Sequence, residues 1–147
     1  MSENEKQTTV WLRQKEHYQF EVTTDYPEDW SSLADEPPSL GEGNGASASR
    51  FLAAGIGHCL AASLLFCLEK SRVMLDGSVN AEVKLTTRRN ERGRWRIERA
   101  DVKIHVPALD EAQKKAFERC SNLYEDFCIV TASVRQGIEV DVELVPA

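Results

Sequence analysis

Four cysteines are the side chains of this sequence best suited to chemistry: Cys59, Cys67, Cys120 and Cys128. Cys128 lies in the segment YEDFCIVTASVRQG, between two acidic residues and a short apolar run. The spacing of Val130 and Val134, with Gly137 as a stop, predicts a short helix that begins directly after Cys128. Free N–H groups at a helix start favour a thiolate, whereas nearby carboxylates disfavour it. These residues alone fit both a reactive thiol and a packed core thiol.

The expected redox compartment limits what the cysteines can do. The amino terminus MSENEKQTTV has neither the basic start nor the apolar core of a secretory signal, so we expect a cytoplasmic protein. Cytoplasmic thiols are mostly reduced, and the cysteines are therefore not interpreted as a disulfide framework. Cys67 and Cys120 are interpreted as free thiols in the core. No cysteine spacing matches a structural zinc site, and we expect no metal and no other cofactor.

Length and charge narrow the class of protein. The 147 residues fit one domain spanning residues 1–147. A net charge of -6 argues against nucleic acid as a partner, because such binding needs clustered Lys and Arg. Residues 51–68, FLAAGIGHCLAASLLFCL, are uncharged and nearly long enough to span a bilayer. Their glycines and alanines make them only moderately apolar, so we interpret them as a buried central helix and expect no membrane.

Sequence periodicity predicts the remaining elements. Alternating apolar residues indicate five strands, at residues 9–13, 17–23, 81–89, 94–106 and 138–144. A change of parity in the fourth strand predicts a bulge near residues 99–101. Prolines, glycines and serines predict an irregular loop over residues 35–49, and helical spacing predicts a second helix over residues 109–123.

This order of elements predicts an α+β fold with an antiparallel sheet around a long buried helix. A helix that is apolar on all sides needs cover on more than one face, and a small sheet covers only one. We therefore expect a homodimer in which a second subunit supplies the missing cover.

Three segments give the chain a resemblance to a known family: DEPPSLGEGNGASASRFLAAGIGHCLAASLLFCL, RNERGRWRI and YEDFCIVTASVRQGIEVDVEL. From about Glu16 to its end the chain resembles the OsmC/Ohr family, the osmotically inducible and organic hydroperoxide resistance proteins. The resemblance implies an OsmC-like fold and an intertwined homodimer, with a two-cysteine site at the subunit interface. Peroxidase members of the family reduce organic hydroperoxides.

The resemblance also implies roles for two thiols. The family's helix cysteine corresponds to Cys59, and its second cysteine, at a short helix start, corresponds to Cys128. Cys59 would attack the peroxide and become a sulfenic acid, and Cys128 would condense with it to a disulfide. An external dithiol would then reduce the pair.

The sequence departs from the family pattern around these thiols. Peroxidase members use a glutamate at the start of the long helix and an arginine from the first strands to activate the thiolate. Ser49 stands at the glutamate position, and the candidate assisting cations are Arg13, Arg50 and Arg135. Without a neighbouring cation, burial on an apolar helix is expected to raise the pKa of Cys59.

Two functions therefore remain open from the sequence. The first is a thiol peroxidase acting on organic hydroperoxides, and the second is a non-catalytic dimer that binds a small apolar ligand in the same cleft. The paired thiols favour the peroxidase, whereas Ser49 favours the ligand-binding protein. For either function we expect an apolar cleft near Cys59, lined by Phe51, Leu52 and Phe66.

Overall fold

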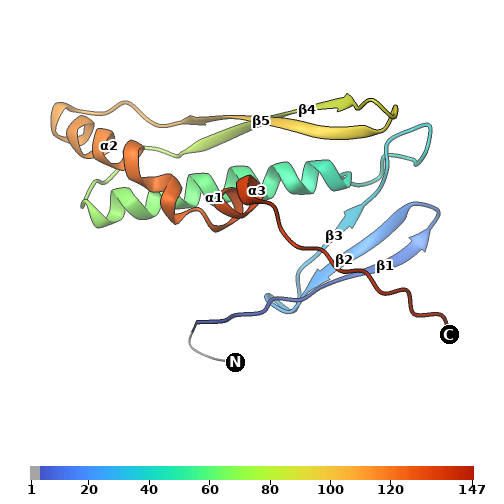
Figure 1. Ribbon diagram of the computed structural model, residues 1–147. Coiled ribbons are helices and arrows are strands. Elements are labelled where there is room, and N and C mark those ends of the chain that lie inside the picture. The colour runs from blue at the N-terminus through green and yellow to red at the C-terminus, as the bar shows by residue number, and fades with distance from the viewer. Residues whose placement is uncertain (1–3) are drawn as a thin grey trace. The chain divides into compact units, whose positions relative to one another are not determined.

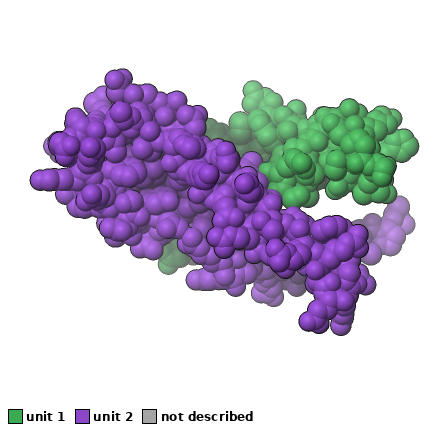
Figure 2. All heavy atoms as spheres, turned by 90° about the horizontal axis from the view of Figure 1, so that it is seen from above, with its two compact units in different colours: residues 1–52 green, residues 53–147 purple. Residues whose placement is uncertain are grey.

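A computed structural model describes residues 4–147 (Figure 1). The chain divides after Leu52 into two compact units, which Figure 2 distinguishes by colour. The first unit holds the amino-terminal strands, and the second holds most of the long helix and everything that follows it.

The first unit contains a three-stranded antiparallel sheet in the order β1-β2-β3. Its strands are β1 (Val10–Glu16), β2 (Gln19–Thr24) and β3 (Ser31–Ala34). The first two confirm the predicted strands, whereas β3 was not predicted. The loop after β3 is ordered by the buried Asp35, whose carboxylate accepts hydrogen bonds from the backbone N–H groups of Glu36 and Asn44 at 2.8 and 3.0 Å.

The predicted long helix is α1, Ala48–Lys70. One stripe of it is buried, comprising Ile56, Gly57, Leu60, Ser63, Leu64, Cys67 and Leu68. On other faces Leu65 and Phe66 are 41% and 45% exposed, so within this chain the helix is buried on one side only. Within residues 4–147, α1 is the one helix that is long and apolar enough to span a membrane. The core helix of a soluble protein can have the same length and hydropathy, so this is weak evidence for a membrane span.

The second unit contains an antiparallel hairpin of β4 (Asn80–Arg89) and β5 (Trp95–His105), which runs along α1 (Figure 1). A Cβ on Gly57 would lie only 2.8 Å from a methyl group of Val83, so the missing side chain lets β4 approach the helix closely. The register shifts where Thr86 and Thr87 pair with Arg99 and Ile97, which leaves Glu98 as the extra residue. The predicted bulge is therefore confirmed one residue before its expected place.

Three helical segments complete the second unit: α2 (Glu111–Leu123), the 3₁₀ turn η1 (Tyr124–Phe127) and α3 (Ile129–Gln136). Asp110 caps α2 by accepting from the backbone N–H of Gln113, whose side chain accepts in return from the backbone N–H of Asp110. Gly137 ends α3 with a φ of 83°, in the left-handed region that glycine adopts most easily. Both predicted helices, and the predicted stop at Gly137, are confirmed.

The predicted last strand, residues 138–144, does not form within residues 4–147. Residues 138–147 form neither helix nor strand, although Ile138, Val140, Val142 and Leu144 alternate as expected. A strand exists only where a neighbour completes its backbone hydrogen bonds, and no segment within residues 4–147 pairs with this one. The four apolar side chains remain 65% to 88% exposed.

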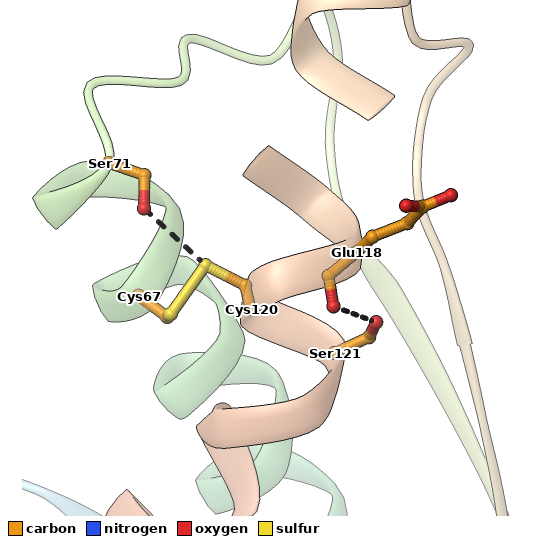
Figure 3. The surroundings of a disulfide bond; sticks show 5 residues. All are labelled: Cys67, Ser71, Glu118, Cys120 and Ser121. Atoms are coloured by element: carbon orange, nitrogen blue, oxygen red, sulfur yellow. Dashed lines mark hydrogen bonds between the residues drawn. A yellow bond between two sulfur atoms is a disulfide. The ribbon is translucent and has the colours of Figure 1, made fainter. Parts of the chain in front are cut away.

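The expectation that all four cysteines are free is also wrong. Cys67 of α1 and Cys120 of α2 form a disulfide, with their Cα atoms 5.7 Å apart (Figure 3). Both residues are buried in the core as expected. The bond forms because the packing of α2 on α1 brings together two residues separated by 53 positions, a proximity that sequence spacing does not contain. The Ser71 hydroxyl oxygen lies 3.7 Å from the Cys120 sulfur.

Candidate functional site

The two remaining cysteines, Cys59 and Cys128, are free and lie in one apolar cluster of the second unit. Cys128 is fully buried there beside Ile56 and Leu60 of α1, and Cys59 packs against this group as a partly buried residue. Val102, Tyr124 and Val130 close the cluster from β5, η1 and α3. The fold therefore brings together the two thiols that the sequence singled out.

Cys128 occupies the N-cap position of α3, as the sequence predicted. Its sulfur accepts a hydrogen bond from the backbone N–H of Thr131 at 3.4 Å. Its thiol donates to the Thr131 hydroxyl oxygen at 3.0 Å, and this hydroxyl can donate to the sulfur instead once the thiol is ionised. Thr131 itself is buried, so water competes little for these contacts.

These contacts set the acidity of Cys128. Burial raises the pKa of the Cys128 thiol, but hydrogen bonds from the Thr131 side chain, from Cys59, from the Thr131 backbone and from Ser63 lower it. Together the hydrogen bonds outweigh the effect of burial, so the pKa of Cys128 lies below the ordinary cysteine value. Ser63 lies one helical turn beyond Cys59 on α1, so both residues face the same neighbour.

Cys59 has the opposite tendency. Burial raises the pKa of Cys59 above its ordinary value, and the hydrogen bond and charge of Cys128 raise it further. Backbone N–H groups of Val130 and Ile129, in the first turn of α3, lower it but do not outweigh these effects. Of the two thiols, Cys128 is therefore the one that ionises more readily.

A cavity of about 400 Å³ opens beside the thiol cluster within the second unit. Its wall includes Ile56, Leu60 and Tyr124, which pack against Cys128, and Thr131, which is hydrogen-bonded to it. The remaining lining residues are Ala100, Val102, Glu125, Val134 and Arg135. The cavity wall is mixed, with apolar side chains beside polar ones that include the ion pair of Glu125 and Arg135.

Arg135 is the assisting candidate that the structure places in the same unit as the thiols. Its guanidinium donates to the Glu125 carboxylate at 2.5 Å, and both side chains line the cavity. The hydrogen bond and charge of Glu125 raise the pKa of Arg135, and the charge of Cys128 adds to this effect. Arg135 therefore lies within electrostatic range of the Cys128 sulfur.

The other assisting candidates belong to the first unit. Arg13 pairs with Glu21 on the β1–β2 hairpin at 2.5 Å and is largely exposed. Arg50 donates to the Ser47 hydroxyl at 2.9 Å, and the hydroxyl oxygens of Ser47 and Ser49 lie 3.5 Å apart. These hydrogen bonds and this ion pair involve other residues of the first unit, and none of them involves a thiol.

The residues expected to line an apolar cleft near Cys59 lie away from the cavity beside Cys128. Phe51 lines a different cavity of about 410 Å³ within the first unit, beside strand residues such as Leu12 and Phe20. Phe66 packs edge-on against Phe127, with ring centroids 5.8 Å apart. Neither they nor Leu52 line the cavity beside Cys128. Helical spacing places a side chain on a face but does not identify the neighbour that fills the space beside it.

Sequence reasoning missed several residues of the site. Thr131 stands three residues after the N-cap, the position whose N–H group a cap side chain binds, so capping rules could have identified it. Ser63 lies four residues after Cys59, which places both on one helix face. Tyr124 and Glu125 have no comparable local signal, because their place depends on how η1 packs. No cluster of three or more metal-ligating side chains occurs within residues 4–147.

Comparisons with known proteins agree with this fold. The OsmC family model, described as OsmC-like protein, matches residues 41–143. A comparison with curated protein sequences gives no significant match.

Solved structures resemble most of the chain at low sequence identity. An OsmC-like protein of unknown function from Vibrio cholerae has a TM-score of 0.71 and 12% identity, covering 88% of this chain and 94% of its own. An organic hydroperoxide resistance protein OsmC from Legionella pneumophila has a TM-score of 0.65 and 14% identity, with coverages of 88% and 90%. The organic hydroperoxide resistance protein OhrB of Bacillus subtilis has a TM-score of 0.59 and 20% identity, with coverages of 86% and 90%. Likeness at such identity establishes a shared fold.

Proposed function

The chain belongs to the OsmC-like protein family, and we propose that it is a thiol peroxidase that reduces organic hydroperoxides with Cys59 and Cys128. The observation that supports this function most directly is the packing of the two free thiols in one cluster beside a cavity. The organic hydroperoxide resistance proteins of Legionella pneumophila and Bacillus subtilis share the fold and point to the same substrate class.

The reaction needs only the two thiols, a peroxide and a reductant. One thiolate attacks the peroxide oxygen, so that an S–O bond forms, the O–O bond breaks, and an alkoxide leaves and takes up a proton. The second thiol then attacks the sulfenic sulfur, forms the S–S bond and releases water. An external dithiol reduces this disulfide by two exchange steps and becomes oxidised itself.

Among the assisting candidates, Arg135 fits this chemistry best. It is a cation that lines the cavity and lies within electrostatic range of Cys128. The contacts of Arg13, Ser49 and Arg50 lie within the first unit and give them no comparable support.

The proposal includes a homodimer, one domain over residues 1–147 and a cytoplasmic location. Exposed apolar side chains on α1 and in residues 138–144 support a second subunit, because a lone chain would leave them in water. The family match begins at residue 41, near the end of the first unit, and continues to residue 143 in the second, which favours one functional domain. In the dimer, the thiol site would lie at the subunit interface.

Counting thiols before and after peroxide treatment tests the function. The purified protein is mixed with one equivalent of cumene hydroperoxide, and free thiols are titrated under denaturing conditions without reductant. We expect both free thiols per chain to be lost and cumyl alcohol to form. A dithiol should then restore both. If both thiols persist and the peroxide is not consumed, the peroxidase is excluded, and the non-catalytic dimer binding a small apolar ligand becomes the better description.

A further inference from the structure

We infer that the Cys67–Cys120 disulfide is a redox switch for the thiol site: the formed bond holds the η1 turn and Cys128 in place, and reduction of the bond releases them. The effect on peroxide turnover rests on the proposed peroxidase function, whereas the effect on structure does not. Disulfides in cytoplasmic proteins are mostly transient and serve catalysis or redox sensing. At the proposed location, this bond would therefore form and break with the redox state of its surroundings.

Two pairs of cysteines lie between the same two segments of the second unit. Cys59 and Cys67 are eight residues apart on α1, and Cys120 and Cys128 are eight residues apart in the segment that runs from α2 to α3. Eight residues rise about 12 Å along a helix, so the Cys67 sulfur is too far from Cys59 for direct thiol exchange. The disulfide therefore acts on the thiol site through the packing between them.

Tyr124 connects the disulfide to the thiol site. It packs against the buried cluster that contains Cys67 and Cys120, and it also packs against the cluster that contains Cys128. Its backbone N–H donates to the Cys120 carbonyl oxygen at the end of α2, and the residue lines the cavity beside the thiols. A movement of Cys120 away from α1 therefore displaces Tyr124 from both clusters.

The η1 turn depends on its neighbours for its position. It is a single 3₁₀ turn, whose hydrogen bonds have poorer geometry than those of an α-helix, and all four of its residues are partly or fully exposed. The backbone N–H of Cys128 donates to the Glu125 carbonyl oxygen at 3.1 Å, so the turn directly places Cys128. The covalent bond at Cys120, four residues before the turn begins, supplies a constraint that the turn lacks.

The surroundings of the bond favour attack at one of its two sulfurs (Figure 3). Cys67 lies three residues before the end of α1 and is 9% exposed, whereas Cys120 is fully buried. An external thiolate therefore reaches the Cys67 sulfur when the last turn of α1 opens, and Cys120 is the leaving group. The Ser71 hydroxyl, 3.7 Å from the Cys120 sulfur, can donate a hydrogen bond to the thiolate that forms there.

Reduction by an external dithiol balances in two exchange steps. One thiolate of the dithiol attacks the Cys67 sulfur, so that a mixed disulfide forms and the electron pair of the broken S–S bond leaves with Cys120. The second thiol of the reagent then displaces Cys67. The two cysteines take up the two protons of the dithiol, which becomes a disulfide, and a small oxidised disulfide restores the bond by the reverse steps.

Hydrogen exchange in dithiothreitol buffers tests the structural effect. The Cys59→Ser protein is used, so that dithiothreitol titrates the Cys67–Cys120 bond while Cys128 stays a free thiol. Differential alkylation and mass spectrometry give the state of the bond, and deuterium uptake is measured at labelling times too short for global unfolding to contribute. On reduction we expect about tenfold faster uptake in residues 124–131, a coupling typical of residues in contact, and unchanged uptake in β4.

Ser71→Ala, with Ser121→Ala as its matched control, tests which sulfur is attacked. Ser121 is the sequence neighbour of Cys120, but its hydroxyl donates to the Glu118 carbonyl oxygen at 2.8 Å (Figure 3). Ser71→Ala should slow the reduction of the bond by about two- to tenfold, the effect of one hydrogen bond, and Ser121→Ala should leave the rate unchanged. Equal rates in both variants and the parent protein would overturn the role assigned to Ser71.

Peroxide treatment connects the switch to the proposed function. Native protein and the Cys67→Ala, Cys120→Ala double variant are mixed with excess cumene hydroperoxide, and mass spectrometry gives the ratio of Cys59–Cys128 disulfide to sulfinic acid. A displaced η1 slows the condensation of the two thiols, so the double variant should contain more sulfinic acid. A bond that only stabilised the fold would leave this ratio unchanged in the folded protein.

The outcomes separate the switch from the peroxidase. Faster exchange in residues 124–131 on reduction supports the switch. A bond that dithiothreitol cannot reduce in the folded protein, or whose reduction leaves this exchange unchanged, overturns the switch and leaves the peroxidase intact. If exchange increases on reduction but the native protein consumes no peroxide, the structural switch stands and the proposed function fails.

Discussion

Thr131 makes two contacts with the Cys128 sulfur, one from its backbone N–H at 3.4 Å and one through its hydroxyl at 3.0 Å. Both come from a single residue in the first turn of α3, and both are buried. Because both contacts are buried, the pKa of the Cys128 thiol depends on a residue in the first turn of α3. The acidity of Cys128 is therefore open to change by one substitution at Thr131.

Replacing Thr131 by valine should make Cys128 less acidic. Valine keeps the shape of threonine and the backbone N–H but removes the hydroxyl that stabilises the thiolate. The pKa of Cys128 should rise, so the rate at which iodoacetamide alkylates Cys128 at neutral pH should fall, by about tenfold if the shift is one unit. The rate should recover as the pH rises through the new pKa, because the thiolate then forms without help. Stopped-flow rates between pH 6 and 10 measure this.

Thr87→Val is a matched control for this experiment. Thr87 lies on β4, exposed and away from the thiols, and valine suits a strand. Its pH profile should overlay that of the native protein. A Thr131→Val profile that also overlays the native one would contradict the role of the hydroxyl.

Replacing Arg135 by glutamine should slow the first oxidation without unfolding the protein. The pair with Glu125 is exposed, with side-chain exposures of 61% and 44%, so its loss should hardly affect stability. The charge it contributes near Cys128 is lost, and we expect a rate reduction of about two- to fivefold at low salt. Rapid-mixing kinetics at low and high ionic strength measure it, because salt should reduce the difference.

Arg88→Gln is the matched control for Arg135→Gln. Arg88 forms a similar exposed ion pair with Glu98 on the β4–β5 hairpin, at 3.3 Å and with exposures of 69% and 46%. Its replacement removes the same charge from the protein without touching the cavity. Equal slowing by both substitutions would assign the effect to net charge rather than to the site.

The Cys67–Cys120 disulfide should stabilise the second unit. It joins residues 53 positions apart, and in the chain-entropy model a loop of this length contributes about 4 kcal/mol. The double substitution Cys67→Ala and Cys120→Ala should therefore lower the melting temperature by roughly 10 °C. Calorimetry without reductant measures this.

The single substitutions provide the internal test of the disulfide prediction. Cys67→Ala and Cys120→Ala each break the same bond, so each alone should cause most of the loss seen in the double variant. Losses that simply add would show two independent packing effects. A melting temperature unchanged in all three variants would show that the bond contributes nothing to stability.

The sequence predicts the elements whose signals are local. The alternation in β2 and β5, the helical spacing of α2 and the stop at Gly137 each reflect burial or backbone geometry within a few residues. The four-residue strand β3 has no such signal, because its pairing with β2 is decided by contacts distant in sequence.

The site shows the same division between local and distant information. The N-cap position of Cys128 is local and was predicted. The proximity of Cys59 to Cys128 came from the family resemblance, since spacing cannot relate residues so far apart. The disulfide at Cys67 and the ion pair between Arg135 and Glu125 were not predicted, because both depend on how helices and the η1 turn pack together.

Residues 138–144 show a strong strand pattern without a strand. Their apolar side chains alternate and are exposed, and within residues 4–147 their backbone finds no pairing partner. An unpaired segment of this kind readily adds to the edge of another sheet. We therefore predict a homodimer of twice 16.5 kDa at micromolar concentration, stabilised by this segment. Sedimentation velocity measures it.

Two triple variants separate the apolar face of this segment from its charge. One replaces alternate apolar residues by serine: Ile138, Val140 and Val142. The other replaces the acidic residues between them by their amides: Glu139, Asp141 and Glu143. The serine variant should sediment as a monomer because it loses the apolar burial, worth roughly 1.5 to 3 kcal/mol for each side chain. The amide variant should remain a dimer, and a native protein that sediments as a folded monomer would refute the assembly.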